Sequence, residues 1–228
     1  MAQVFHVKLR ELGARFGVDT EPLVRVLQLQ ADDPTASTTV RDPELAADRH
    51  VADSLVALDL APVRQARTIA DLGSGAGWPG LALAAALPET QVFLVESAIR
   101  HCRYLQRAID VAGLRNATVV HSRAEEWSCA CDLVTARALA ALPVVLEYAA
   151  PLLVEAGHLV AWKAAIGPDE SAAATVASAE LRLAPVEVRR VEPYGGAGDR
   201  TLHVFRKAGP TPRRFPRRPG MAVKRPLG

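Results

Sequence analysis

A glycine-rich segment carries the residues whose types and spacing are best suited to chemistry. Asp71-Leu-Gly73-Ser-Gly75-Ala-Gly77 places three glycines at alternate positions after the short apolar segment 68–72. Glycine lets the backbone turn tightly and approach a ligand closely. At the carboxyl end of a parallel strand, such a turn holds the nucleoside part of a cofactor. The segment therefore predicts a binding site for a nucleoside-containing cofactor.

Two classes of cofactor fit this pattern. Gly75-Ala-Gly77-Trp-Pro-Gly80 matches G-x-G-x-x-G, the fingerprint of NAD-binding proteins. The charge of Asp71 would repel a pyrophosphate, and Pro79 lacks an N–H that could bind one. An acid before the turn instead suits the ammonium side of S-adenosylmethionine (SAM). We predict SAM as the cofactor, with an NAD-dependent oxidoreductase as the more remote alternative.

Further cofactor contacts are expected where the next two strands end. Glu96 is the last residue of the apolar segment 91–96, and a carboxylate there can accept hydrogen bonds from both ribose hydroxyls. Ala124 and Glu125 follow the third strand, 117–122, where an adenine would lie. We expect the backbone of Ala124 and the side chain of Glu125 to contact the adenine edge.

Basic residues follow three predicted strands. Arg123, Arg137 and Lys163 come at or after the ends of the third, fourth and fifth strands, so we expect them at the same sheet edge as the cofactor. Such cations suit phosphate groups and other anions. His50 and Asp53 are one helical turn apart and face the same way. They either contact the substrate or fix a helical segment to the rest of the molecule.

The elements that must position these residues follow from hydrophobic periodicity. Apolar residues at helical spacing predict a helical cap over residues 1–64, in which Pro62 ends the last helix. Strands then alternate with helices over 65–208, which predicts a Rossmann-like α/β domain with a mostly parallel, seven-stranded sheet and helices on both faces. The predicted strands are 68–72, 91–96, 117–122, 131–137, 158–163, 186–191 and 201–206, and the helices between them are 81–87, 99–113, 142–153 and 169–181.

The last twenty residues, 209–228, form a separate basic tail. Six arginines and lysines lie there without an acid, although the whole chain of 228 residues carries a net charge of only +2. A basic tail on an acidic body favours a polyanionic partner. Its proline- and arginine-rich composition is not expected to pack by itself. We expect its removal to weaken binding of that partner while SAM affinity stays the same.

Cysteines and the first residues point to the cytoplasm. Cys102, Cys129 and Cys131 lack the spacing of metal ligands, so we expect free thiols and no metal site. The N-terminus lacks an apolar signal core, and no apolar run is long enough to cross a bilayer. We therefore expect a cytoplasmic protein without a membrane segment.

Several motifs together resemble one family. The segments D-L-G-S-G-A-G-W-P-G-L (71–81), S-R-A-E-E (122–126), A-R-A-L-A (136–140) and W-K-A (162–164) occur in the order typical of the 16S rRNA guanine-N7 methyltransferases of the RsmG (GidB) type. V-R-D-P (40–43), R-H-V-A-D-S-L (49–55) and the tail 215–227 are also similar to that family. The family's aromatic W-x-x-x-x-N-L-T segment is missing before Val40, and its usual L-K-G reads W-K-A.

This resemblance implies a SAM-dependent enzyme that methylates N7 of a guanine in the 530 loop of 16S rRNA, on the small ribosomal subunit. The products would be the methylated base and S-adenosylhomocysteine, and we expect a monomer. By motif, the SAM pocket would be lined by Gly73, Trp78, Ala124, Glu125 and Arg137. The methyl-transfer and RNA side would be lined by Arg49, His50, Asp53, Arg123, Arg137 and Lys163. Two alternatives stay open. The protein could be a methyltransferase that acts on another RNA or on a small molecule, or a non-catalytic RNA-binding module. The presence of Asp71, Gly73 and Glu96 argues against the second alternative.

Overall fold

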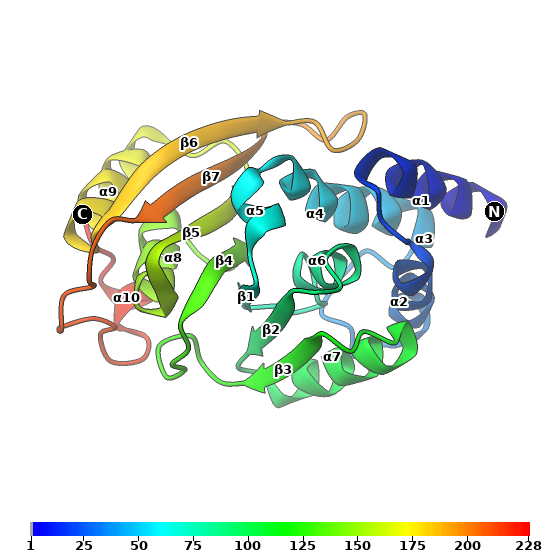
Figure 1. Ribbon diagram of the computed structural model, residues 1–228, viewed down its shortest axis with the longest axis horizontal. Coiled ribbons are helices and arrows are strands. Elements are labelled where there is room, and N and C mark those ends of the chain that lie inside the picture. Colours follow the sequence, from blue (N-terminus) through cyan, green and yellow to red (C-terminus); the bar gives the residue numbers. More distant parts are fainter. Residues whose placement is uncertain (1) are drawn as a thin grey trace.

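A seven-stranded sheet forms the centre of the molecule, in a computed structural model that describes residues 2–228 (Figure 1). The strand order is β3-β2-β1-β4-β5-β7-β6, in which the first five strands are parallel and β6 and β7 are antiparallel. This is the predicted Rossmann-like α/β architecture. The strands are β1 (Thr68–Leu72), β2 (Gln91–Glu96), β3 (Ala117–His121), β4 (Cys131–Arg137), β5 (Leu153–Lys163), β6 (Leu183–Val191) and β7 (Arg200–Lys207).

The chain before β1 is helical, as predicted. It contains α1 (Ala2–Phe16), α2 (Glu21–Asp32), α3 (Pro43–Ala46), a π-helical turn (Ala47–Ala52), α4 (Asp53–Leu55), a 3₁₀ turn (Val56–Asp59) and α5 (Ala61–Gln65). The side chain of Asp42 caps α3 by accepting a hydrogen bond from Leu45 N. The prediction that Pro62 ends the last helix of the cap is wrong: it lies in the first turn of α5, where a missing N–H leaves no hydrogen bond unmade.

Helices cover both faces of the sheet (Figure 1). One face packs against the cap, α6 (Gly80–Ala86) and α7 (Ile99–Ala112), and the other against α8 (Leu142–Ala149) and α9 (Pro168–Glu180). Neighbouring residues of β1 enter different cores, Ile69 the first and Ala70 the second, as strand alternation requires. Helix α8 ends earlier than predicted, before a 3₁₀ turn (Ala150–Leu152), and β5 begins directly after that turn.

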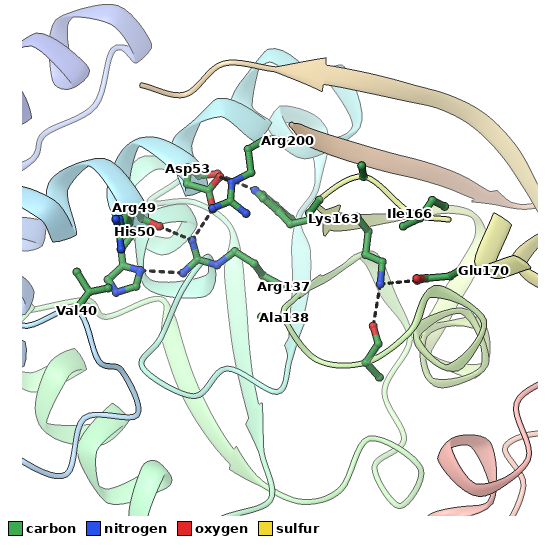
Figure 2. Close-up of a pocket in the computed structure, with 14 residues that line it drawn as sticks. Val40, Arg49, His50, Asp53, Arg137, Ala138, Lys163, Ile166, Glu170 and Arg200 are labelled. Carbon is green, nitrogen blue, oxygen red and sulfur yellow. Dashed lines mark hydrogen bonds and ion pairs between the residues drawn. The ribbon is translucent and has the colours of Figure 1, made fainter. Parts of the chain in front are cut away.

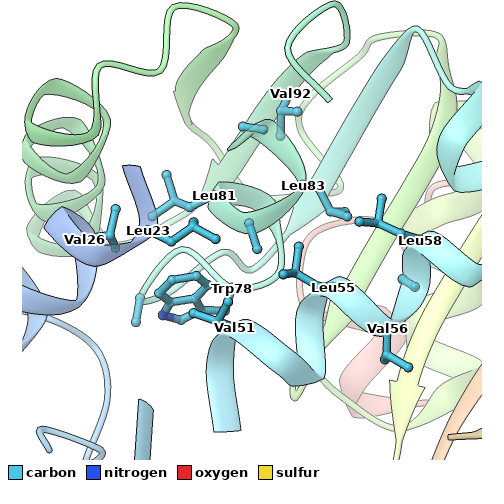
Figure 3. Packing of buried hydrophobic residues seen from close by; sticks show 14 of the residues in the cluster. Leu23, Val26, Val51, Leu55, Val56, Leu58, Trp78, Leu81, Leu83 and Val92 are labelled. Atoms are coloured by element: carbon cyan, nitrogen blue, oxygen red, sulfur yellow. The ribbon is translucent and has the colours of Figure 1, made fainter. Parts of the chain in front are cut away.

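The cap shares a hydrophobic core with the sheet domain. Figure 3 shows Leu23 of α2 and Val51 and Leu55 of the cap helices beside Leu81 and Leu83 of α6, and all five side chains are buried. Burial of large aliphatic side chains stabilises by roughly 1.5–3 kcal/mol each. The helical segment that carries His50 and Asp53 is therefore held firmly over the sheet.

The basic tail is folded onto the molecule: it does not pack by itself but against the sheet domain. Phe215 is 7% exposed and Ala222, in the short helix α10 (Met221–Lys224), is 2% exposed, and both belong to the core beneath α8 and α9. Apolar residues spaced among the arginines supply the contacts. Figure 1 shows the tail in red beside α8 and α9. Within residues 2–228, no helix combines the length and the apolar character needed to cross a membrane.

Candidate functional site

The glycine loop between β1 and α6 lies at the carboxyl edge of the parallel strands. Gly73, Gly75 and Gly77 have φ values of 66°, 52° and 96°, in the left-handed region that favours glycine. A Cβ on Gly77 would lie 2.2 Å from Leu81 Cδ1, so a side chain there would displace the buried side chain of Leu81. The three glycines therefore set the path of the loop.

Asp71 lies beneath this loop and does not face a ligand. Its side chain is 1% exposed; Oδ1 accepts a hydrogen bond from Thr135 Oγ1 (2.9 Å) and Oδ2 accepts one from Gly80 N (3.3 Å). Burial raises the pKa of this carboxyl to about 6. The prediction that Asp71 contacts the cofactor does not fit this placement. Asp71 instead joins β1, β4 and the start of α6 under the loop.

Glu96 is tied to the glycine loop from the end of β2. Its Oε2 accepts a hydrogen bond from Gly75 N (3.0 Å) and its Oε1 accepts one from Ala98 N (2.8 Å), and the residue is 8% exposed. Each carboxylate oxygen has a further lone pair for another donor. Glu96 is therefore fixed at the loop with acceptor capacity left for ribose hydroxyls.

A small cavity of about 140 Å³ opens where β1, β2 and β3 end. It brings together four of the predicted site residues, Gly73, Arg123, Ala124 and Glu125. Its other lining residues are Val95, Ser97, Ser122, Leu139 and Tyr148. Val95, Ala124 and Leu139 offer apolar surface for a ring, and the polar side chains beside them can bind the edge of an adenine. The residues therefore fit the nucleoside half of SAM, whose reactive sulfonium supplies a methyl group when the cofactor is bound.

A larger cavity of about 570 Å³ lies on the other side of the segment 138–140, which lines both cavities. Figure 2 shows Arg137 at its centre, between His50 and Asp53. Arg137 Nη1 donates to Asp53 Oδ2 (2.8 Å) and to the carbonyl of Arg49 (3.1 Å), and Nη2 lies 3.2 Å from His50 Nδ1. Arg137 thus links β4 to the cap, and the predicted residues Arg49, His50, Asp53 and Arg137 lie together.

His50 is an uncharged hydrogen-bond acceptor for Arg137. Because a guanidinium only donates, His50 Nδ1 accepts, and the proton resides on Nε2, which lies 3.1 Å from Thr38 Oγ1. Burial, followed by the charge of Arg137, lowers the pKa of His50 to about 3. The ring also stacks on Trp78, with centroids 5.7 Å apart. His50 therefore orients Arg137 without carrying a charge of its own near neutral pH.

Replacing His50 with glutamine is expected to flatten the acid side of the stability profile. Below pH 6.5 the unfolded chain protonates His50 while the folded chain does not, so wild-type stability falls as the pH drops towards 3. This contribution reaches at most about 1.4 kcal/mol per pH unit. Urea unfolding at several pH values between 4 and 7 measures the difference in slope between the two proteins. Parallel profiles would contradict the placement of a neutral His50.

Lys163 lines the same cavity from the end of β5, where it forms an ion pair with Glu170. Its Nζ lies 2.7 Å from Glu170 Oε1 and donates to the carbonyl of Ala140 (3.0 Å). Arg123 lines the small cavity instead, so the three predicted cations share an edge but not a cavity. Lys163 therefore holds the segment 138–140 in place.

Two charged residues of the larger cavity were missed from the sequence, Glu170 and Arg200. Arg200 Nε lies 3.9 Å from Asp53 Oδ1, and these two buried atoms have no hydrogen-bond partner among residues 2–228. Arg200 begins β7, which joins the sheet antiparallel to β5. In the sequence, Arg200 is marked only by its place beside another charged residue, Asp199, at the start of an apolar strand.

Trp78 links the cap to the sheet domain and does not line either cavity. It is 4% exposed, and its indole N–H donates to Oε1 of the fully buried Gln30 (2.8 Å). The prediction that Trp78 lines the SAM pocket therefore does not fit the structure. Trp162 is also buried, with its indole N–H donating to the carbonyl of Asp53.

A seven-stranded Rossmann-like sheet with a glycine loop after β1 and a loop-bound carboxylate at the end of β2 defines a class I SAM-dependent methyltransferase. The structure is similar to fibrillarin from Aeropyrum pernix in complex with SAM (TM-score 0.53, 17% identity, 68% of this chain and 72% of that chain). It is also similar to a ribosomal protein L11 methylase from Lactobacillus delbrueckii (TM-score 0.54, 18% identity, 68% and 77%). At these identities the similarity concerns the fold.

The family follows from sequence comparison. Residues 29–194 match the GidB family model, described as rRNA small subunit methyltransferase G. Proteins named ribosomal RNA small subunit methyltransferase G are 40% identical in Rubrobacter xylanophilus, over 82% of this chain and 75% of the relative, and 34% identical in Symbiobacterium thermophilum, over 99% of both. The chain belongs to this family of SAM-dependent rRNA methyltransferases, as the motifs predicted.

Proposed function

We propose that the protein transfers the methyl group of SAM to N7 of a guanine in the 530 loop of 16S rRNA, on the small ribosomal subunit. The observation that carries the proposal is the larger cavity: cationic side chains line it, and it shares the segment 138–140 with the small cavity that includes Gly73. Membership of the rRNA small subunit methyltransferase G family supports the RNA substrate. The same reasoning favours a cytoplasmic enzyme, and we propose a monomer.

The cofactor contacts come from the loop and the two strand ends that follow. We propose that Glu96 accepts hydrogen bonds from the ribose hydroxyls, while Ala124 and Glu125 contact the adenine. Gly73 and the backbone of the glycine loop approach the methionine part. Two observations support this arrangement of the cofactor: Glu96 is hydrogen-bonded to the glycine loop, and the small cavity lies beside Ala124.

The residues of the larger cavity suit an attack that needs no base. Neutral guanine N7 has a free lone pair and no proton, so alignment with the sulfonium methyl suffices, and positioning can contribute roughly 7–11 kcal/mol. His50 is uncharged and Asp53 is bonded to Arg137, in keeping with a site that orients its substrate. We propose that Arg137 and Arg200, which line this cavity, bind O6 or phosphate and leave N7 free.

The tail adds affinity for the RNA backbone. Arg218, Lys224 and Arg225 are exposed on a tail whose fold is fixed by its buried residues. Contacts of such cations with phosphates release counterions, so binding weakens steeply with salt. We propose that these three side chains contact rRNA phosphates next to the site.

Modification mapping tests the function. The gene for this chain is deleted, or introduced into a bacterium that lacks its own family member, and N7-methylguanosine is mapped along 16S rRNA by chemical cleavage. We expect the modification in the 530 loop only when the protein is present. Purified protein, SAM and small subunits should reproduce it in vitro. Methylation of another RNA, or of none, would overturn the proposed substrate.

A further inference from the structure

A backbone hydrogen bond joins the tail to the wall of the small cavity. Gly220 N donates to Glu125 Oε1 at 2.9 Å, although 95 residues separate the two in the chain. Glu125 belongs to the turn 122–126 that lines this cavity together with Ala124. The tail therefore holds the side chain that was expected to contact adenine.

A buried ion pair anchors this part of the tail. The guanidinium of Arg217 donates to both carboxylate oxygens of Glu147, through Nε (2.8 Å) and Nη2, and Glu147 is 1% exposed on α8. Arg217 Nη2 also donates to the carbonyl of Arg225, which closes the tail on itself (2.9 Å). Removal of Arg217 alone would leave the buried carboxylate without its charged partner, which is strongly destabilising, so a substitution of Arg217 should loosen the docked tail.

Apolar packing joins the tail to the same wall. Phe215 and Ala222 belong to one hydrophobic cluster with Tyr148, which follows Glu147 on α8 and lines the small cavity. Ala124 and Leu139, two further residues of the cavity wall, pack against that cluster. The tail therefore supports the cavity wall from behind by packing, by an ion pair and by a hydrogen bond.

We propose that the tail, residues 209–228, is a structural part of the SAM site and that cofactor binding and tail docking stabilise each other. This inference rests on the proposed cofactor site. It replaces the expectation that removing the tail leaves SAM affinity unchanged. Because coupling between two sites is reciprocal, the cofactor should order the tail as strongly as the tail strengthens cofactor binding.

The first test measures binding of S-adenosylhomocysteine, without RNA, to full-length wild type, Arg217→Ala and Arg213→Ala by calorimetry. Arg213 is exposed on the same tail, so its substitution removes the same charge without touching Glu147. We expect Arg217→Ala to weaken binding at least about fivefold, the lower range of coupled sites, and Arg213→Ala to change it less than about twofold. Trypsin cleavage within the tail reports whether Arg217→Ala has released it.

Hydrogen exchange on the wild type gives a second test that needs no variant. Saturating S-adenosylhomocysteine should slow amide exchange over residues 215–225, including Gly220. A released tail with unchanged affinity, or a tail whose exchange ignores the bound ligand, would overturn the coupling. If Arg217→Ala does not fold, the exchange result alone decides. Failure of the wild type to bind S-adenosylhomocysteine would instead refute the proposed cofactor site itself.

Discussion

Arg137→Ala is expected to lower the rate of methyl transfer by about 100-fold or more, because the substrate base loses the cation that orients it. It should also destabilise the fold by about 3–5 kcal/mol, since Asp53 is 4% exposed and its carboxylate would be left without its 2.8 Å partner. Single-turnover methylation of small subunits measures the first effect, and urea unfolding measures the second.

A double variant separates the two roles of Arg137. Arg137→Ala with Asp53→Asn removes both charges together, so no buried carboxylate is left without its cation, and much of the lost stability should return. We expect activity to stay low in the double variant. Recovery of activity together with stability would show that Arg137 only holds the cap in place and would contradict its role at the substrate.

The second large effect is expected for Glu96→Ala, which should weaken SAM binding by about 100-fold or more. The variant removes the acceptor for two backbone N–H groups, Gly75 N and Ala98 N, and the proposed acceptor for the ribose hydroxyls. Hydrogen bonds to a charged group contribute about 1.5–3 kcal/mol each. The loss of the two proposed bonds to the ribose hydroxyls therefore reaches about a 100-fold change in affinity. Calorimetry with S-adenosylhomocysteine measures it.

Matched variants make the Glu96 result specific. Glu89→Ala removes an exposed carboxylate just before β2, at the opposite end of that strand, and should bind as the wild type does. Glu96→Gln keeps an acceptor oxygen but loses the charge, so we expect an intermediate affinity. Equal affinities for Glu96→Ala and wild type would show that the ribose is bound elsewhere.

Local pattern predicted the sheet well because burial on both faces leaves a clear apolar signal. The bounds of β2 and β4 were predicted to the residue. The glycine loop could also be placed, since its left-handed φ values demand glycine at fixed spacing. The position of Arg137 at the carboxyl edge of the sheet could be predicted from the order of strands and helices.

The errors concern residues whose partners are far away in the chain. Asp71 was expected to face a ligand, but its partner Thr135 lies on β4 and draws the carboxylate beneath the loop. Trp78 was expected in a pocket, but Gln30 of α2 holds it in the core. The docking of the tail could not be predicted, because the buried acid that anchors it, Glu147, cannot be recognised from composition.

The ion pair between Arg217 and Glu147 also has a consequence for synthesis of the protein. Helix α8 leaves the ribosome about seventy residues before its partner arginine, so on our inference the cofactor pocket is completed only when the last part of the chain has emerged. A stop codon just after β7 would leave every strand of the sheet intact. We nevertheless expect such a gene to behave as a loss-of-function allele.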